Sequence, residues 1–224
     1  MKSVIDSDQN TETRHRLLEA AGEVFAKRGF RQATVREICK RAHANVAAIN
    51  YHFHDKRGLY EAVLKHALRC VREKYCTAHR PITSANAEQE MREMIAARLH
   101  AVFDLGRTAW HGKLMSREMI EPTEALNAVV KEELAPFFQR LQSCVRAILG
   151  PETSGEQVRR CAFSISSQWV FYHYNRQVIS RLDPTMRFGS EDIGALAEHI
   201  AQFSLAALKE LRRTNDRKHM SPLP

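Results

Sequence analysis

The chain has 224 residues, of which 44% are hydrophobic and 27% charged, and it carries a net charge of +8 at pH 7. This hydrophobic content can build a sizeable core, which excludes an intrinsically disordered chain. No apolar run exceeds four residues, so we expect no membrane span and no secretory signal, and a location in the cytoplasm. The five cysteines show no CxxC spacing, which predicts thiols rather than disulfides.

Positive charge is concentrated toward the beginning of the chain. Residues 11–57 contain ten Lys and Arg against five Asp and Glu, an excess of +5 in 47 residues. Residues 58–224 contain 23 against 19, an excess of +4 in 167 residues. A protein that is basic only for solubility would spread its charge evenly. The distribution therefore favours a nucleic acid as partner over a membrane surface.

The polar residues 1–10 are expected to form a flexible arm, and helical periodicity begins after them. The apolar residues of this first helix recur every three or four positions: Leu17, Leu18, Ala21, Val24 and Phe25. Gly29 is expected to end the helix, with Phe30 as an apolar plug behind it.

Two short helices follow, each with a recognisable start. Thr34 and Glu37 form a capping box that begins a helix reaching about Arg41. A tight turn at His43-Ala44 leads to Asn45, which caps a third helix over residues 46–53.

This third helix is predicted to point Val46, Ile49 and Phe53 inward. Asp55 then caps a long fourth helix that should reach the high seventies and stop before Pro81.

Every segment beyond Pro81 has the pattern of a helix, and no strand-like alternation of useful length occurs. The expected helices cover 86–106, 109–119, 123–149 with an interruption at Pro136, 155–181 and 191–213. The fold class is therefore all-α with about nine helices. The expected domains are a flexible arm at 1–10, a helix-turn-helix head at 11–57, a helical ligand-binding and dimerisation domain at 58–213, and a flexible tail at 214–224.

Residues 34–53 have the arrangement that a helix-turn-helix requires, in which the second helix can enter a major groove. Ala47 and Ala48 are small enough to let that helix approach base edges, and Asn50 can address adenine or a phosphate. The groups suited to phosphate oxygens follow at Tyr51, His52, His54, Lys56 and Arg57.

These residues closely resemble the signature of the TetR family of transcription regulators. The resemblance rests on the strings Thr34–Cys39, Asn45–Phe53 and Asp55–Tyr60. Ala20-Ala21, Phe25 and Gly29-Phe30 also match the family's first-helix pattern, so the resemblance spans about fifty residues. The later string Arg117–Thr123 resembles the subgroup with a YbiH-type (CecR-like) C-terminal domain. The family pattern most often has Gly-Val where this chain has His43-Ala44, so His43 must adopt a mildly strained left-handed conformation or present its imidazole to the DNA backbone.

The resemblance implies roles residue by residue. It assigns base-edge contacts to Arg36, Ala47, Ala48 and Asn50, and phosphate contacts to Thr34, Asn45, Tyr51, His52 and Lys56. The alternatives are purely structural: Thr34 and Asn45 as caps alone, Tyr51 as partly core, and Arg36 as a solvated helix residue.

The larger domain offers candidates for two further sites. A ligand cavity needs apolar walls with a few polar groups, and the candidates are Phe103, Trp110, Met115, Met119, Trp169, Tyr172, His173 and Arg176. A homodimer interface is expected along two late apolar stripes, at Ile165, Trp169, Leu196, His199, Ile200, Phe203 and Leu208. For any one of these residues, an ordinary place in the core is the alternative.

Other chemistries find little support. His66 and Cys70 have metal-ligand spacing but no evident third ligand, so we expect no metal site. Nothing indicates a reactive thiol at Cys70 or Cys76. The chain lacks a nucleophile elbow, a phosphate-binding loop and a cofactor fingerprint, so we expect no catalytic residue and no cofactor.

The sequence therefore predicts a repressor that binds a palindromic double-stranded operator as a homodimer and is released by a small molecule of unknown identity. The competing hypothesis is a constitutive or architectural DNA-binding protein. Against it stands the length of the helical domain, which exceeds what dimerisation needs.

Overall fold

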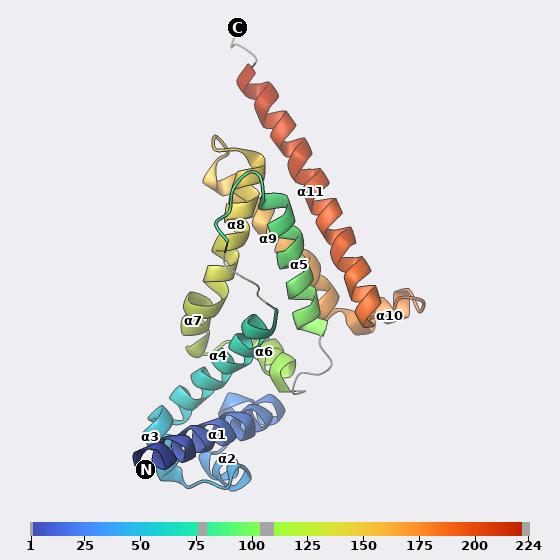
Figure 1. Ribbon diagram of the computed structural model, residues 1–224. Coiled ribbons are helices and arrows are strands. Elements are labelled where there is room, and N and C mark those ends of the chain that lie inside the picture. Colours follow the sequence, from blue (N-terminus) through green and yellow to red (C-terminus); the bar gives the residue numbers. More distant parts are fainter. Residues whose placement is uncertain (1, 76–79, 104–109, 221–224) are drawn as a thin grey trace. The chain divides into compact units, whose positions relative to one another are not determined.

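The computed structural model describes residues 2–75, 80–103 and 110–220 (Figure 1). Within these ranges the secondary structure consists of eleven α-helices and one short π-helical segment, without strands. The all-α class is confirmed. The count exceeds the expected nine because two of the expected helices are each divided in two. In the part of the chain that the structure describes, no helix is long and apolar enough to cross a membrane.

The helices form two compact units, and most contacts lie within one unit or the other. The first unit holds α1 (Lys2–Gln32), α2 (Val35–Ala42), α3 (Val46–Phe53), α4 (Lys56–Tyr75) as far as Glu73, α6 (Trp110–Ile120), α7 (Ala125–Val129) and the π-helical segment Val130–Leu134. The second unit holds α5 (Ala87–Phe103), α8 (Ala135–Leu149), α9 (Gly155–Tyr174), α10 (Arg176–Leu182) and α11 (Ser190–Met220).

The core of the first unit is built around Tyr60 of α4, whose side chain is 1% exposed. Its ring packs edge-on against Phe25 of α1, with the centroids 4.8 Å apart, and against Phe30 at 5.0 Å. The predicted inward residues of α1 are buried as expected, and Phe30 is a half-buried plug. Gly29, with φ at +76°, marks a kink at the predicted end of this helix, although the helical turns continue to Gln32.

A buried hydrogen bond joins α4 to α6 within the same unit. The hydroxyl of Tyr60 donates to Glu118 Oε2 at 2.7 Å, and the Glu118 side chain is fully buried. The other carboxylate oxygen accepts from the backbone N–H of Thr123 at 2.8 Å and from its hydroxyl at 2.9 Å. Both oxygens of this buried carboxylate are therefore satisfied, as a group removed from water requires. Burial raises the pKa of the Tyr60 hydroxyl, and the hydrogen bond to Glu118 raises it further.

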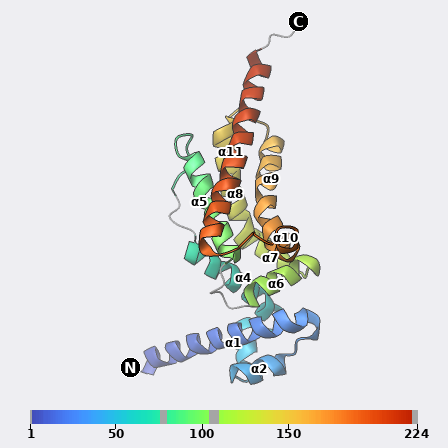
Figure 2. The same ribbon diagram turned by 90° about the vertical axis from the view of Figure 1, so that its right-hand side faces the viewer.

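The second unit is a bundle in which α5 packs against α8, α9 and α11 (Figures 1 and 2). Its core is aliphatic, with Met91, Ile95 and Leu99 of α5 fully buried at the centre. Glu90 is also buried, and its charge is paired with Arg140 at 2.5 Å and with Arg80 at 3.0 Å.

Two expected helices are interrupted for identifiable reasons. The π-helical segment ends at Leu134, just before Pro136, whose missing N–H prevents a regular α-helical turn, so the predicted interruption is confirmed. The break between α9 and α10 was not predicted, since no Gly or Pro marks it. There the Asn175 side chain donates to the Phe171 carbonyl at 3.0 Å and shares this acceptor with its own backbone N–H at 2.9 Å.

The chain ends differ from the expected irregular segments. Helix α1 begins at Lys2, and α11 continues to Met220, so residues 2–10 and 214–220 are helical. Neither segment contains Gly or Pro, and extending an existing helix costs little once it is nucleated. The flexibility of these ends and the predicted domain limits stay predictions.

The buried bond between Tyr60 and Glu118 leads to a prediction about stability. Replacing Tyr60 with Phe keeps the ring but leaves a buried carboxylate oxygen without its donor. We expect the free energy of unfolding to fall by about 1.5–3 kcal/mol, measured by urea denaturation. Tyr51→Phe is the matched control, because the Tyr51 side chain is 71% exposed and should lose almost nothing. Equal stability of the two variants would contradict a role for the buried bond.

Candidate DNA-binding site

The helix-turn-helix has the predicted caps. Thr34 Oγ1 accepts from the N–H of Glu37 at 3.2 Å, and Asn45 Oδ1 accepts from the N–H of Ala48 at 2.8 Å. His43 lies in the left-handed region at φ 49° and ψ 46°, as expected for the turn. Its N–H bonds to the Lys40 carbonyl, which closes the end of α2. These local bonds fix the start of α3 relative to α2.

Helix α3 turns one face inward and one face to solvent. Ile49 and Phe53 are buried, as predicted, but Val46 is 46% exposed, so the expectation that it points inward is wrong. Helix α3 has only eight residues, and it buries Ile49 and Phe53, whereas Val46 lies at its first position. The solvent-facing residues are Ala47, Asn50 and Tyr51, while Ala48 is half-buried against the core.

A second tight connection joins α3 to α4. His54 has a positive φ of 69°, which the sequence did not indicate. Asp55 Oδ1 accepts from the N–H of Gly58 at 2.8 Å, which confirms the predicted cap. A Cβ atom at Gly58 would lie 2.0 Å from the backbone oxygen of Phe53, so glycine is needed for this close approach.

The predicted phosphate contacts surround this connection. Lys56 donates to the Arg31 carbonyl at 3.4 Å and lies over the Phe30 ring at 4.8 Å, so its ammonium is held against the head. His52 is half-buried, and its pKa is lowered by burial and by the nearby charge of Arg14. Its imidazole is therefore biased toward the neutral form.

Several arginines of the first unit already bind acidic side chains. Arg28 bonds to Glu37 at 2.8 Å, Arg41 pairs with Glu23, and Arg57 pairs with Glu124. Arg36 is exposed on α2. Thr34 and Asn45 are exposed as well as being caps, so their structural role leaves a DNA contact open.

Three of the predicted ligand-cavity residues lie in the first unit. Trp110 is 5% exposed, and its Nε1 donates to Glu19 Oε2 at 3.2 Å. Met115 is partly buried and packs against the core, whereas Met119 is 43% exposed. Two pockets of this unit, of about 380 and 790 Å³, are lined by other residues.

The other ligand-cavity candidates lie in the second unit. Phe103 stacks on Phe188 with the centroids 5.0 Å apart, and the guanidinium of Arg176 lies within 5.3 Å of both rings. Trp169 is buried and meets Phe137 edge-on at 6.0 Å. Tyr172 and His173 are half-buried. Packing thus accounts for Phe103 and Trp169, and ligand binding stays a prediction for the whole set.

Most predicted dimer-interface residues lie in the core of a single chain. The buried ones are Ile165, Trp169, Leu196, Ile200 and Leu208. His199 is exposed, and Phe203 is 63% exposed. The apolar periodicity identified the inner faces of α9 and α11. The predicted residue Phe203 lies on the outer face of α11, where Leu211 is also exposed, and the outer face of α9 carries exposed apolar residues that were not predicted: Phe163, Val170, Phe171 and Tyr174.

The cysteines differ in their surroundings: Cys70 is half-buried with its Sγ 3.7 Å from His66 Nε2, and the expectation that its thiol is unreactive stays a prediction. Cys39 and Cys144 are buried, and burial raises the pKa of both thiols, to about 11 for Cys144. Cys76 lies outside the described residues. A buried residue that sequence reasoning missed is Glu118, whose hydrogen bonds join α4 to α6 and which lies in the string resembling the CecR-like subgroup.

Comparison with known proteins agrees with this geometry. Residues 17–63 match the family described as bacterial regulatory proteins, tetR family. Residues 87–208 match the C-terminal domain of the HTH-type transcriptional dual regulator CecR. The chain is 25% identical to the HTH-type transcriptional repressor NicS of Pseudomonas putida, over 95% of this chain and 98% of NicS.

Other matches are shorter or show the fold alone. The probable HTH-type transcriptional regulator YttP of Bacillus subtilis is 24% identical, but the match spans only 57% of this chain and 58% of YttP. The crystal structure of AibR in complex with isovaleryl coenzyme A and operator DNA superposes with a TM-score of 0.57 at 14% identity, over 85% of this chain and 97% of AibR. Since the two family matches together cover the helix-turn-helix and more than half of the chain, the protein belongs to the TetR family of DNA-binding transcription regulators, with a CecR-like C-terminal domain.

Proposed function

We propose that the protein is a ligand-responsive repressor that binds a palindromic operator as a homodimer and leaves it when a small molecule binds to the C-terminal domain. The observation that carries this proposal is the helix-turn-helix. Its α2 and α3 begin at the capped positions Thr34 and Asn45, and α3 presents Ala47 and Asn50 to solvent. NicS is named a repressor, and AibR was solved with both an acyl-coenzyme A and operator DNA, which supports the ligand and DNA roles.

In this proposal α3 enters the major groove. Asn50 hydrogen-bonds to a base edge, and Ala47 and Ala48 allow close approach or contact a thymine methyl. Arg36 of α2 reaches a base from beside the groove. Thr34, Asn45, Tyr51, His52 and Lys56 hold the phosphates on either side.

Dimerisation would pair the outer faces of α9 and α11, which contact each other within one chain. On α9 the exposed residues Phe163, Val170, Phe171 and Tyr174 recur at helical spacing. On α11, His199 and Phe203 lie four residues apart and are also exposed. Large exposed apolar groups at this spacing are typical of a surface that another chain covers. A two-fold dimer carries two reading heads, which is why the operator should be palindromic.

Ligand and operator would compete through two conformations of the dimer. The chain passes from the first unit to the second at the end of α4, between Glu73 and Lys74. A change in the second unit that shifts α4 would therefore reach Tyr60 and the helices packed on it. Such a regulator acts where the chromosome is, in the cytoplasm.

Two other functions predict different behaviour. A constitutive architectural protein would bind DNA with little sequence preference and would respond to no small molecule. An enzyme would turn over a substrate, but the relatives named above are all transcription regulators.

The proposal is tested by selecting the sequences that the protein binds from random DNA. Small molecules are then screened for those that release the protein from the most enriched sequence. We expect a palindromic sequence to be enriched and at least one compound to lower its affinity at fixed salt. Enrichment without symmetry would argue against the dimer. A compound that binds the protein but leaves operator affinity unchanged would argue against the coupling.

The base contact of Arg36 predicts a loss of specificity. Arg36→Ala should weaken binding to the selected operator by about 1–3 kcal/mol, measured by fluorescence anisotropy. The difference in affinity between the operator and unrelated DNA should become smaller. Arg160→Ala is the control, because Arg160 is an exposed arginine of α9 in the other unit. If Arg36→Ala weakened all sequences equally, Arg36 would be a phosphate contact.

If the outer face of α11 lies in the dimer interface, a charged side chain placed there should weaken the dimer. Phe203→Glu places a carboxylate where a second chain should pack, so sedimentation should shift from dimer toward monomer. Ile120→Glu is the control, since Ile120 is 77% exposed in the other unit. A Phe203→Glu protein that remained dimeric would place the interface elsewhere.

A further inference from the structure

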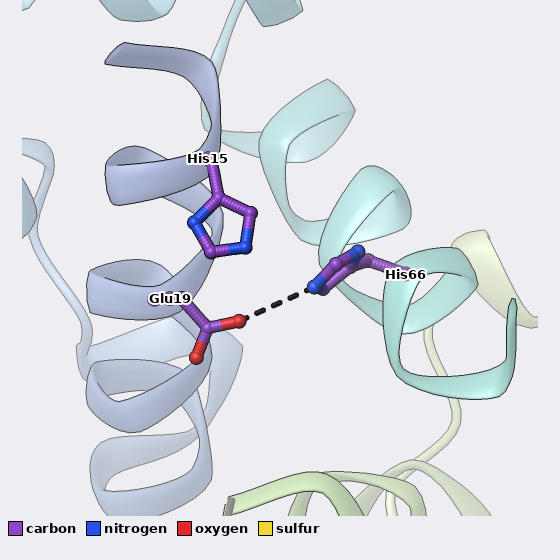
Figure 3. Close-up of side chains that lie close together, drawn as sticks. All are labelled: His15, Glu19 and His66. Atoms are coloured by element: carbon purple, nitrogen blue, oxygen red, sulfur yellow. Dashed lines mark hydrogen bonds and ion pairs between the residues drawn. The ribbon is translucent and has the colours of Figure 1, made fainter. Parts of the chain in front are cut away.

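Helices α1 and α4 bring three potential metal ligands together in the first unit. His15 and Glu19 lie four residues apart on α1, and His66 projects toward them from α4 (Figure 3). The ligand atoms of the three side chains all lie within 4.8 Å of one another. The sequence placed His66 beside Cys70 only. The other two ligands are distant in the chain and become neighbours through the packing of α4 against α1.

The distances suit a metal ion after small side-chain rotations. His66 Nε2 lies 3.2 Å from Glu19 Oε1, and the rings of His15 and His66 stand perpendicular with their centroids 5.8 Å apart. Zinc bonds to imidazole nitrogen and carboxylate oxygen are about 2.0–2.2 Å long, so ligands of one ion lie roughly 3–4 Å apart. His15 is exposed and can turn to close the remaining gap.

The carboxylate is held in place by a contact from outside the cluster. Trp110 Nε1 donates to Glu19 Oε2 at 3.2 Å, while Oε1 is the oxygen that faces His66. The indole itself packs tightly, because a Cβ atom at Gly22 would lie 2.4 Å from it. Partners of this kind orient metal ligands in protein sites.

Of three positive charges near the cluster, two are paired with acidic side chains, and the third, Arg14, lies over the Phe53 ring. Arg14, Lys65 and Arg69 line the pocket of about 380 Å³ that His66 also borders. Lys65 is bonded to Glu61 at 2.7 Å and Glu132 at 2.8 Å, and Arg69 pairs with Glu133 at 3.8 Å. The pocket leads from solvent to His66 and provides a path of entry for an ion.

We propose that His15, Glu19 and His66 form a binding site for a borderline divalent transition-metal ion such as Zn²⁺. Two imidazoles and one carboxylate match the donor preference of this class, whereas Mg²⁺ and Ca²⁺ prefer oxygen ligands alone. A water molecule completes the coordination. The ion cross-links α1 to α4 and thereby stiffens the unit that carries the helix-turn-helix. Without the metal ion, His66 and Glu19 are joined directly by a hydrogen bond.

The test uses the full-length chain after treatment with a chelator. Zn²⁺ is titrated in competition with a chromophoric chelator, and thermal melting is followed with and without the metal. We expect one Zn²⁺ per chain and a rise in melting temperature, while Mg²⁺ has no effect. His15→Ala, His66→Ala and Glu19→Gln should each weaken Zn²⁺ binding by more than about tenfold, the loss that even an outer contact can cause.

Controls separate loss of the site from loss of the fold. His43→Asn removes an exposed histidine of the turn after α2, where asparagine tolerates the left-handed backbone, and should bind Zn²⁺ as the unaltered chain does. The metal-free Glu19→Gln chain should keep its melting temperature, because the amide retains an acceptor for Trp110. No saturable binding at one ion per chain, or tight binding that survives both histidine substitutions, would overturn the proposal. Neither operator nor effector is needed, so the outcome is independent of the proposed repressor function.

Discussion

The first unit depends on one constraint, which is that the fully buried carboxylate of Glu118 must be hydrogen-bonded. Its donors are the Tyr60 hydroxyl and both donors of Thr123. Tyr60 in turn packs against Phe25 and Phe30 of the helix-turn-helix head. Because a buried acceptor that loses its donor costs about 1–3 kcal/mol, these contacts hold α4 and α6 to the head. The two strings that resemble the family and its subgroup meet at this bond.

This connection gives α4 a physical role in the proposed switch. Its first turns belong to the head, where Gly58 and Tyr60 are fixed by close backbone approach and by the buried bond. Its last residues belong to the second unit. In the proposed switch, a displacement of α4 would pass from Tyr60 to Glu118 of α6 through the buried hydrogen bond. The metal site proposed at His66 acts on the same helix and would resist such a displacement.

Sequence reasoning succeeded where a signal is local. The caps at Thr34, Asn45 and Asp55 and the left-handed His43 each follow from a residue type and the positions next to it. It failed where the outcome depends on packing.

Val46 is exposed because a helix of two turns buries only part of its apolar residues. Ile200 was expected in a dimer interface but is buried in the core, because the apolar pattern of a helix does not distinguish the two locations. Neither the partners of Glu118 nor the proximity of Glu19 to His66 could be predicted from spacing, since the paired residues are 58 and 47 positions apart.

We propose that two copies of α3 read two halves of one operator through the major groove. Dimethyl sulfate footprinting on the selected operator tests it, because the reagent probes guanine N7 in that groove. The account predicts two symmetric patches of protection, which an effector abolishes together. Protection of a single patch, or none in the major groove, would contradict it.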